Sequence, residues 1–162
     1  MMERNNGIQS RTVLLQHDLF YEHVLELIRE GKQVTIPVKG WSMRPFLRHQ
    51  GDHVVLDSFD KSDLIPGKIV LAKDRRGRVI LHRIVSVSEH GNLILMGDGN
   101  IKGYELVIPT DVAGVVTFLI RRNKQISVDN KGFTYASRLW CRLLPLRPYL
   151  LFIYNLIDKI KK

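Results

Sequence analysis

A charged turn separates two short apolar runs in the segment 69–87, which is IVLAKDRRGRVILHRIVSV. The runs, 69–72 and 79–87, are rich in β-branched residues and have the length of strands. Gly77 punctuates the turn between them, and a solvated hairpin tip explains the charges of that turn. This pattern predicts a β-hairpin in the middle of the chain.

Further β-type runs lie on both sides of this hairpin, at 34–38, 53–56, 93–96 and 112–120. Turns that contain glycine separate them, as expected where strands follow one another closely. The sequence therefore predicts a mainly β fold.

Helices are predicted at the two ends of the chain. Residues 18–29 form an amphipathic pattern, with Asp18 as the expected N-cap. Residues 135–162 are predicted to form two helical pieces, split by prolines. These elements divide the chain into three expected parts, namely an N-terminal helical segment 1–33, a β domain 34–120 and a C-terminal helical tail 121–162.

Composition limits the class of protein. The chain has 162 residues, of which 44% are hydrophobic and 25% charged, as is typical of a globular unit with its own core. Its single cysteine, Cys141, excludes an internal disulfide and a paired-cysteine zinc or redox site. No apolar run has the length of a membrane span, and residues 1–10 are polar. We therefore expect a cytoplasmic protein.

The net charge of +9 is concentrated at the C-terminal end. Residues 1–120 have a net charge of +1, whereas 121–162 hold 10 Lys and Arg against 2 Asp and Glu, a net charge of +8. Because the body is nearly neutral, we expect no nucleic-acid partner. The tail also holds a dense apolar stretch. We expect it either to contact an anionic membrane peripherally, at the inner face, or to pack on the β body or another subunit.

Three clusters hold residues suited to catalysis. Ser42 lies in the turn 40–45 (GWSMRP) after a predicted strand, where a nucleophilic hydroxyl and free backbone N–H groups come together. His82 lies between two isoleucines on one strand face, where a neutral imidazole accepts a serine proton. Asp98 lies in 97–100 (GDGN). Taken singly, these residues have ordinary explanations as a cap, a core histidine and a hairpin turn.

Taken in order, the clusters resemble the signal peptidase and SOS-repressor superfamily of serine peptidases. The resemblance covers residues 34–119, and these motifs carry it: Gly40-x-Ser42-Met43-x-Pro45, Gly51-Asp52, Pro66-Gly67, His82-Arg83-Ile84, Gly97-Asp98-Gly99-Asn100 and Gly114. The histidine before Arg-Ile is similar to the branch found in endoplasmic-reticulum and archaeal signal peptidases, where histidine replaces a lysine base. The resemblance implies a coiled β-sheet, Ser42 as nucleophile, His82 as general base, and Asp98 as the acid that orients the base. Glu105, in the segment that follows, is the alternative acid. The Ser42 backbone N–H is the expected oxyanion donor.

These residues predict a serine endopeptidase that cleaves a peptide or protein precursor by Ser/His acyl-enzyme chemistry. The chain differs from the family in having Lys68 after Gly67, and no Ala-Gly or Cys-Gly bond precedes Ser42, so we expect no self-cleavage. The alternative is a non-catalytic member of the fold that binds a peptide strand along a sheet edge. His49 and His53 have a metal-like spacing without a third ligand, so we expect neither a metal nor a cofactor. The oligomeric state stays open.

Overall fold

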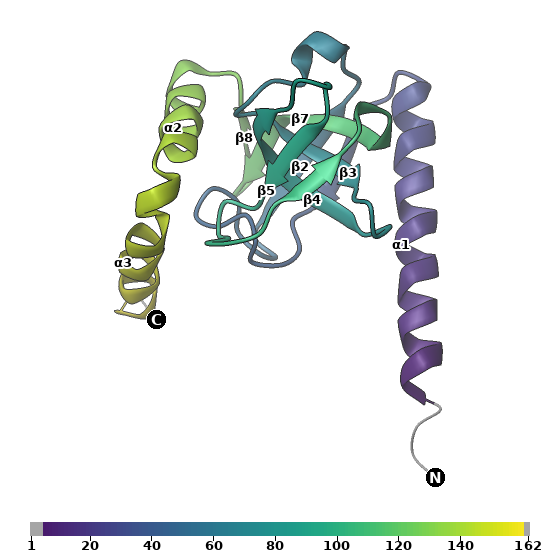
Figure 1. Ribbon diagram of the computed structural model, residues 1–162, viewed down its shortest axis with the longest axis horizontal. Coiled ribbons are helices and arrows are strands. Elements are labelled where there is room, and N and C mark those ends of the chain that lie inside the picture. The colour runs from purple at the N-terminus through teal and green to yellow at the C-terminus, as the bar shows by residue number, and fades with distance from the viewer. Residues whose placement is uncertain (1–4, 161–162) are drawn as a thin grey trace.

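A coiled antiparallel sheet lies between helices from the two ends of the chain (Figure 1). The structure is a computed structural model that describes residues 5–160, with the side chains of 17–157 and 159–160. The helices are α1 (Asn5–Arg29), α2 (Lys131–Arg142) and α3 (Arg147–Ile160). The strands are β1 (Val34–Pro37), β2 (Asp52–Asp57), β3 (Ile69–Lys73), β4 (Val79–Val87), β5 (Leu93–Met96), β6 (Glu105–Val107), β7 (Val112–Arg121) and β8 (Lys124–Ser127).

The mainly β prediction is confirmed, and every predicted strand is present. The strand order is β1-β2-β7-β3-β4-β5-β6, with β8 paired to β7. Two strands, β6 and β8, were not predicted. β6 has only 3 residues, and β8 begins with Lys124 and Gln125, which lack β-type character. The sheet therefore extends beyond residue 120, the expected end of the β domain.

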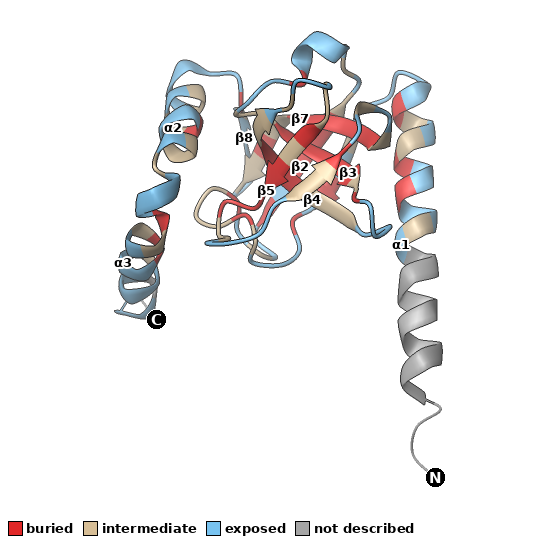
Figure 2. Ribbon diagram, in the orientation of Figure 1, coloured by how far each residue is buried: buried red, intermediate tan, exposed pale blue. Residues whose placement is uncertain are grey.

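Strand β3 is buried on both faces and divides the core into two layers. Ile69 and Leu71 pack with α1 residues, whereas Val70 and Ala72 point into a second cluster with residues of β5 and β7. This burial explains why the run 69–72 is continuously apolar instead of alternating. Figure 2 shows the buried residues concentrated in the sheet.

Helix α1 ends at Arg29, as predicted, but it begins at Asn5, so the expected N-cap at Asp18 is wrong. The Asp18 carboxylate instead forms an ion pair with Lys73 at 3.1 Å. The buried face of α1 includes Tyr21, whose hydroxyl donates to the Asp111 carbonyl at 2.8 Å. Burial raises the pKa of Tyr21 to about 12, so the hydroxyl keeps the proton that it donates.

The C-terminal region forms two α-helices joined by a 3-10 turn, Leu144–Leu146. The first helix starts at Lys131, earlier than predicted, because Asn130 accepts a hydrogen bond from the Phe133 N–H as an N-cap. Pro145 lies in the turn that separates the helices. Pro148 lies inside the first turn of α3, where the missing N–H is tolerated. Within residues 5–160, no helix is long and apolar enough to cross a membrane.

Candidate active site

Ser42 and His82 come together between two segments that are distant in sequence. Ser42 lies in a tight turn after β1, closed by the Arg44 N–H donating to the Trp41 carbonyl at 3.2 Å. His82 lies within β4 and is 6% exposed. Its Nε2 atom is 3.1 Å from the Ser42 Oγ atom. This is hydrogen-bonding distance for a serine and the base that accepts its proton.

Glu105, at the start of β6, supplies the carboxylate beside the imidazole. Its Oε2 atom is 3.0 Å from the His82 Nδ1 atom. In the tautomer with the proton on Nδ1, that N–H donates a hydrogen bond to Glu105, and Nε2 stays free to accept the serine proton. Of the two acids that the sequence proposed, the structure brings Glu105 and not Asp98 against His82.

Asp98 is fully buried and pairs with Arg83 instead. The Arg83 Nε and Nη2 atoms donate to its two carboxylate oxygens at 2.8 and 2.7 Å. Side-chain alternation along β4 explains why Asp98 contacts Arg83 and not His82. Arg83 follows His82 in the strand and therefore points to the opposite face. Both partners are 0% exposed, so each needs the other's charge. The role that the resemblance gave to Asp98 therefore does not fit its position.

This buried pair also connects α2 to the site. Arg83 Nη1 donates to Ser137 Oγ of α2 at 2.7 Å. The Trp140 indole, also in α2, donates to the Asp98 carbonyl at 3.1 Å. The Arg83 guanidinium lies over the Phe46 ring, 4.6 Å from its centroid. The segment that carries Asp98 is thus fixed to both β4 and α2.

Two glycines allow this segment to lie against the Ser42 turn. The Gly99 N–H donates to the Ser42 carbonyl at 2.7 Å. A Cβ atom on Gly97 would be 2.5 Å from the Ser42 carbonyl oxygen, and one on Gly99 would be 2.8 Å from the Trp41 carbonyl oxygen. Any other residue therefore forces the two backbones apart. The sequence offered a hairpin turn as the explanation for Gly97-Asp98-Gly99-Asn100, but the close approach to Ser42 is what requires these glycines.

A second ion pair lies behind Glu105. The Arg78 Nη2 atom is 3.9 Å from Glu105 Oε1 and 2.6 Å from Asp74 Oδ2. Burial favours a higher pKa for the Asp74 carboxyl, but hydrogen bonds from Arg78 and Arg76 outweigh it, and the pKa lies below its ordinary value. Asp74 thus keeps its negative charge and holds Arg78 near Glu105. The sequence predicts that the charges of residues 73–78 are solvated. Asp74 is an exception, because it is only 6% exposed and pairs with Arg78.

The Ser42 backbone N–H is the expected oxyanion donor. In the part of the chain that the structure describes, no group accepts a hydrogen bond from it. A donor beside the nucleophile that is not used within the fold suits an oxyanion on a substrate carbonyl.

An apolar cleft of about 330 Å³ lies beside the strands that lead to both residues. Its lining includes Ile36 and Lys39, which precede Ser42, and Leu81, which precedes His82. Residues 79–82 of β4 pair with β3 but not with β5, and β1 pairs only with β2 among the described strands. Both strands therefore have an unpaired backbone edge that an extended peptide can join.

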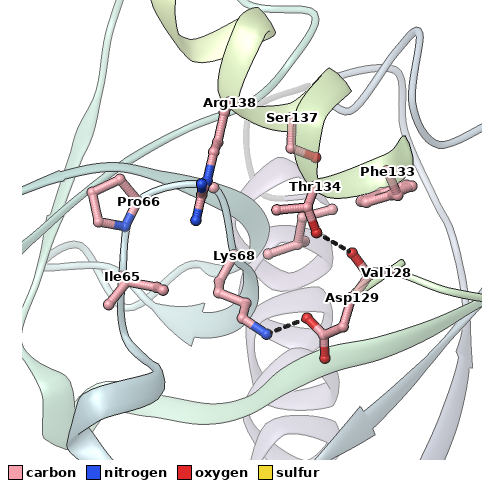
Figure 3. Close-up of a pocket in the computed structure, with 11 residues that line it drawn as sticks. Ile65, Pro66, Lys68, Val128, Asp129, Phe133, Thr134, Ser137 and Arg138 are labelled. Carbon is pink, nitrogen blue, oxygen red and sulfur yellow. Dashed lines mark hydrogen bonds and ion pairs between the residues drawn. The ribbon is translucent and has the colours of Figure 1, made fainter. Parts of the chain in front are cut away.

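A smaller cavity of about 50 Å³ lies between α2 and the segment before β3 (Figure 3). Ser42 and His82 line neither this cavity nor the larger cleft, but only the larger cleft is lined by residues of β1 and β4. Lys68, where the sequence differs from the pattern of the resemblance, forms an ion pair with Asp129 at this cavity (Figure 3). Lys68 thus has an ionic partner in the segment that leads into α2.

Neither histidine with metal-like spacing belongs to this site. The His49 Nδ1 atom accepts a hydrogen bond from the Gly40 N–H at 3.0 Å, and His53 is an exposed residue of β2. Among the described residues, no group of three or more His, Cys, Asp or Glu is placed to hold a metal ion.

Comparisons with known proteins identify no relative of this chain. No protein-family model, no curated protein and no solved structure matches the chain. The function is therefore argued from the residues and their geometry.

Proposed function

We propose that the chain is a serine endopeptidase that cleaves a peptide or protein precursor in the cytoplasm or at the inner face of the membrane. One observation carries the proposal. The Ser42 hydroxyl, the His82 imidazole and the Glu105 carboxylate form a continuous hydrogen-bonded chain, with distances of 3.1 and 3.0 Å. An uninvolved serine, histidine and glutamate have no reason to align in the order nucleophile, base and orienting acid. The resemblance to the signal peptidase and SOS-repressor superfamily supports the same function.

The proposed reaction has two steps. In the first, the Ser42 Oγ atom attacks the scissile carbonyl while His82 Nε2 takes its proton, and the Ser42 N–H donates to the oxyanion. His82 then gives this proton to the leaving amine as the carbon–nitrogen bond breaks. In the second, His82 takes a proton from water, which attacks the ester, and returns it to Ser42 Oγ. Glu105 keeps the imidazole in the required tautomer and stabilises its cationic form.

The substrate class follows from the cleft. We expect an extended peptide that pairs with the edge of β1 or with 79–82 of β4 to run along the cleft toward Ser42. The lining residues Ile36, Leu71 and Leu81 favour an apolar substrate side chain. A non-catalytic peptide-binding protein would use the same edges, so the test must measure acylation and bond cleavage.

The test follows cleavage of a peptide library by mass spectrometry and modification of Ser42 by an acylating probe. Ser42→Ala and His82→Ala should each lower the cleavage rate by at least about a thousandfold, since nucleophile and base act as a unit. The control is Ser62→Ala, which removes an exposed hydroxyl from the 3-10 turn Lys61–Asp63 and should change neither readout. Peptide retention without acylation or cleavage in the unmodified chain would instead support the non-catalytic alternative.

A further inference from the structure

Helix α3 presents an apolar face to solvent. The residues Tyr149, Phe152, Ile153, Leu156, Ile157 and Ile160 are between 47% and 78% exposed. Their spacing of three and four residues places them on one side of the helix. Arg147 and Leu151, on the other side, are 1% and 6% exposed. The helix thus packs on the protein through one side and leaves an apolar face uncovered, and Figure 2 shows most of α3 as exposed.

Such a face needs an occupant, because exposed apolar surface of this extent marks an interaction site. The neighbouring helix α2 extends it. Tyr135 and Leu139 are 70% and 41% exposed, and helical spacing places Arg142 beside them. An aromatic, an aliphatic and a cationic side chain therefore lie on one exposed side of α2 as well.

Charge identifies the chemistry of the occupant. Residues 121–162 have a net charge of +8. Within the described residues, Arg138, Arg142 and Lys159 form no ion pair with a carboxylate. A second copy of the chain would bring the same positive charge against this face, so like-charge repulsion opposes self-association. An anionic lipid bilayer provides an acyl-chain region that can bury the aromatic residues and negatively charged headgroups that can pair with the cations.

We propose that the outward face of α3, together with Tyr135 and Leu139 of α2, binds anionic membrane lipids in the plane of the interface. The proposal does not depend on the peptidase function. Its consequence for the candidate active site comes from Arg147, whose Nη1 atom donates to the carbonyls of Gly97 and Asn100 at 3.1 and 3.3 Å. This is the segment that bonds to Ser42, so the docked helix holds the Ser42–His82 pair close to the lipid surface.

The experiment sediments the full chain with vesicles of phosphatidylcholine, with or without phosphatidylserine. We expect sedimentation only with the anionic vesicles, and a loss of it as salt shortens the screening length from about 10 Å at 0.1 M to about 3 Å at 1 M. The double variant F152Q/L156Q should bind at least about tenfold more weakly, because two exposed apolar side chains no longer enter the interface. The control V87Q/I108Q removes apolar residues that are 41% and 43% exposed on the β body, and it should bind normally.

A second variant tests the electrostatic part separately. R142Q/K159Q keeps the apolar face and should weaken binding at least about fivefold, with a smaller dependence on salt. Three results would overturn the proposal. They are equal sedimentation with both kinds of vesicle, no sedimentation at low salt, and a dimer in analytical ultracentrifugation that F152Q/L156Q converts to monomer. The last result would assign the face to self-association.

Discussion

Asp98 and Glu105 are close in sequence, yet their carboxylates have unlike surroundings. Asp98 is fully buried, and Arg83 occupies both of its oxygens. The Glu105 side chain is 16% exposed, with one oxygen on His82 and the other facing Arg78. His82 and Arg83 point to opposite faces of β4, so the carboxylate that pairs with Arg83 does not lie beside the imidazole. Asp98 therefore serves the packing of the segment, and Glu105 is the acid in contact with the base.

Substitution of each acid by its amide separates these roles. Glu105→Gln keeps the shape but removes the charge that stabilises the imidazolium, so we expect kcat to fall by about a hundredfold or more with little change in stability. Asp98→Asn leaves the buried Arg83 cation without a counter-ion and should lower the free energy of unfolding by about 3–5 kcal/mol. Urea denaturation and peptide cleavage measure the two effects. Full activity of Glu105→Gln, or unchanged stability of Asp98→Asn, would contradict the assignment.

At the scale of elements, the site depends on how closely the segment 97–100 approaches the turn that carries Ser42. Gly97→Ala places a Cβ atom 2.5 Å from the Ser42 carbonyl oxygen, so the backbones must separate. We expect a loss of cleavage of about tenfold or more, because a displaced nucleophile leaves the reach of its base. Gly51→Ala is the control, since its Cβ would have no neighbour nearer than 3.9 Å. A fully active Gly97→Ala would show that the close approach is dispensable.

The elements differ in how far the sequence predicts them. The hairpin of β3 and β4 was predictable because two β-branched runs flank a turn that contains glycine. Alternation also placed His82 on one strand face with its two flanking isoleucines. The choice of Glu105 was not predictable, because β6 is a short strand whose pairing with β5 depends on the whole sheet. Nor does any local pattern show that Arg78 turns toward Glu105, since that contact joins separate segments of the chain.

At the scale of the whole molecule, α2 is part of the packed body and α3 is peripheral to it. Removal of residues 131–162 eliminates the hydrogen bond between Ser137 and Arg83. It also eliminates the contacts of the Phe133 and Trp140 rings with Phe46. We expect this truncation to lower the free energy of unfolding by about 3 kcal/mol or more. A chain that ends at residue 146 keeps these contacts and should lose less. Circular dichroism during urea unfolding compares the three lengths, and identical midpoints for all three would show that α2 adds no stability.

The position of β7 also has a consequence for synthesis on the ribosome. β7 is the seventh strand along the chain, but it lies between β2 and β3 in the sheet. A nascent chain that ends before Val112 therefore has no strand to join these two, and their apolar faces stay open to chaperones and to other nascent chains. Since β3 holds β4 in place, the strand that carries His82 gains its final support only after β7 has emerged. A ribosome-bound fragment thus contains Ser42 and His82 well before it has the sheet that aligns them.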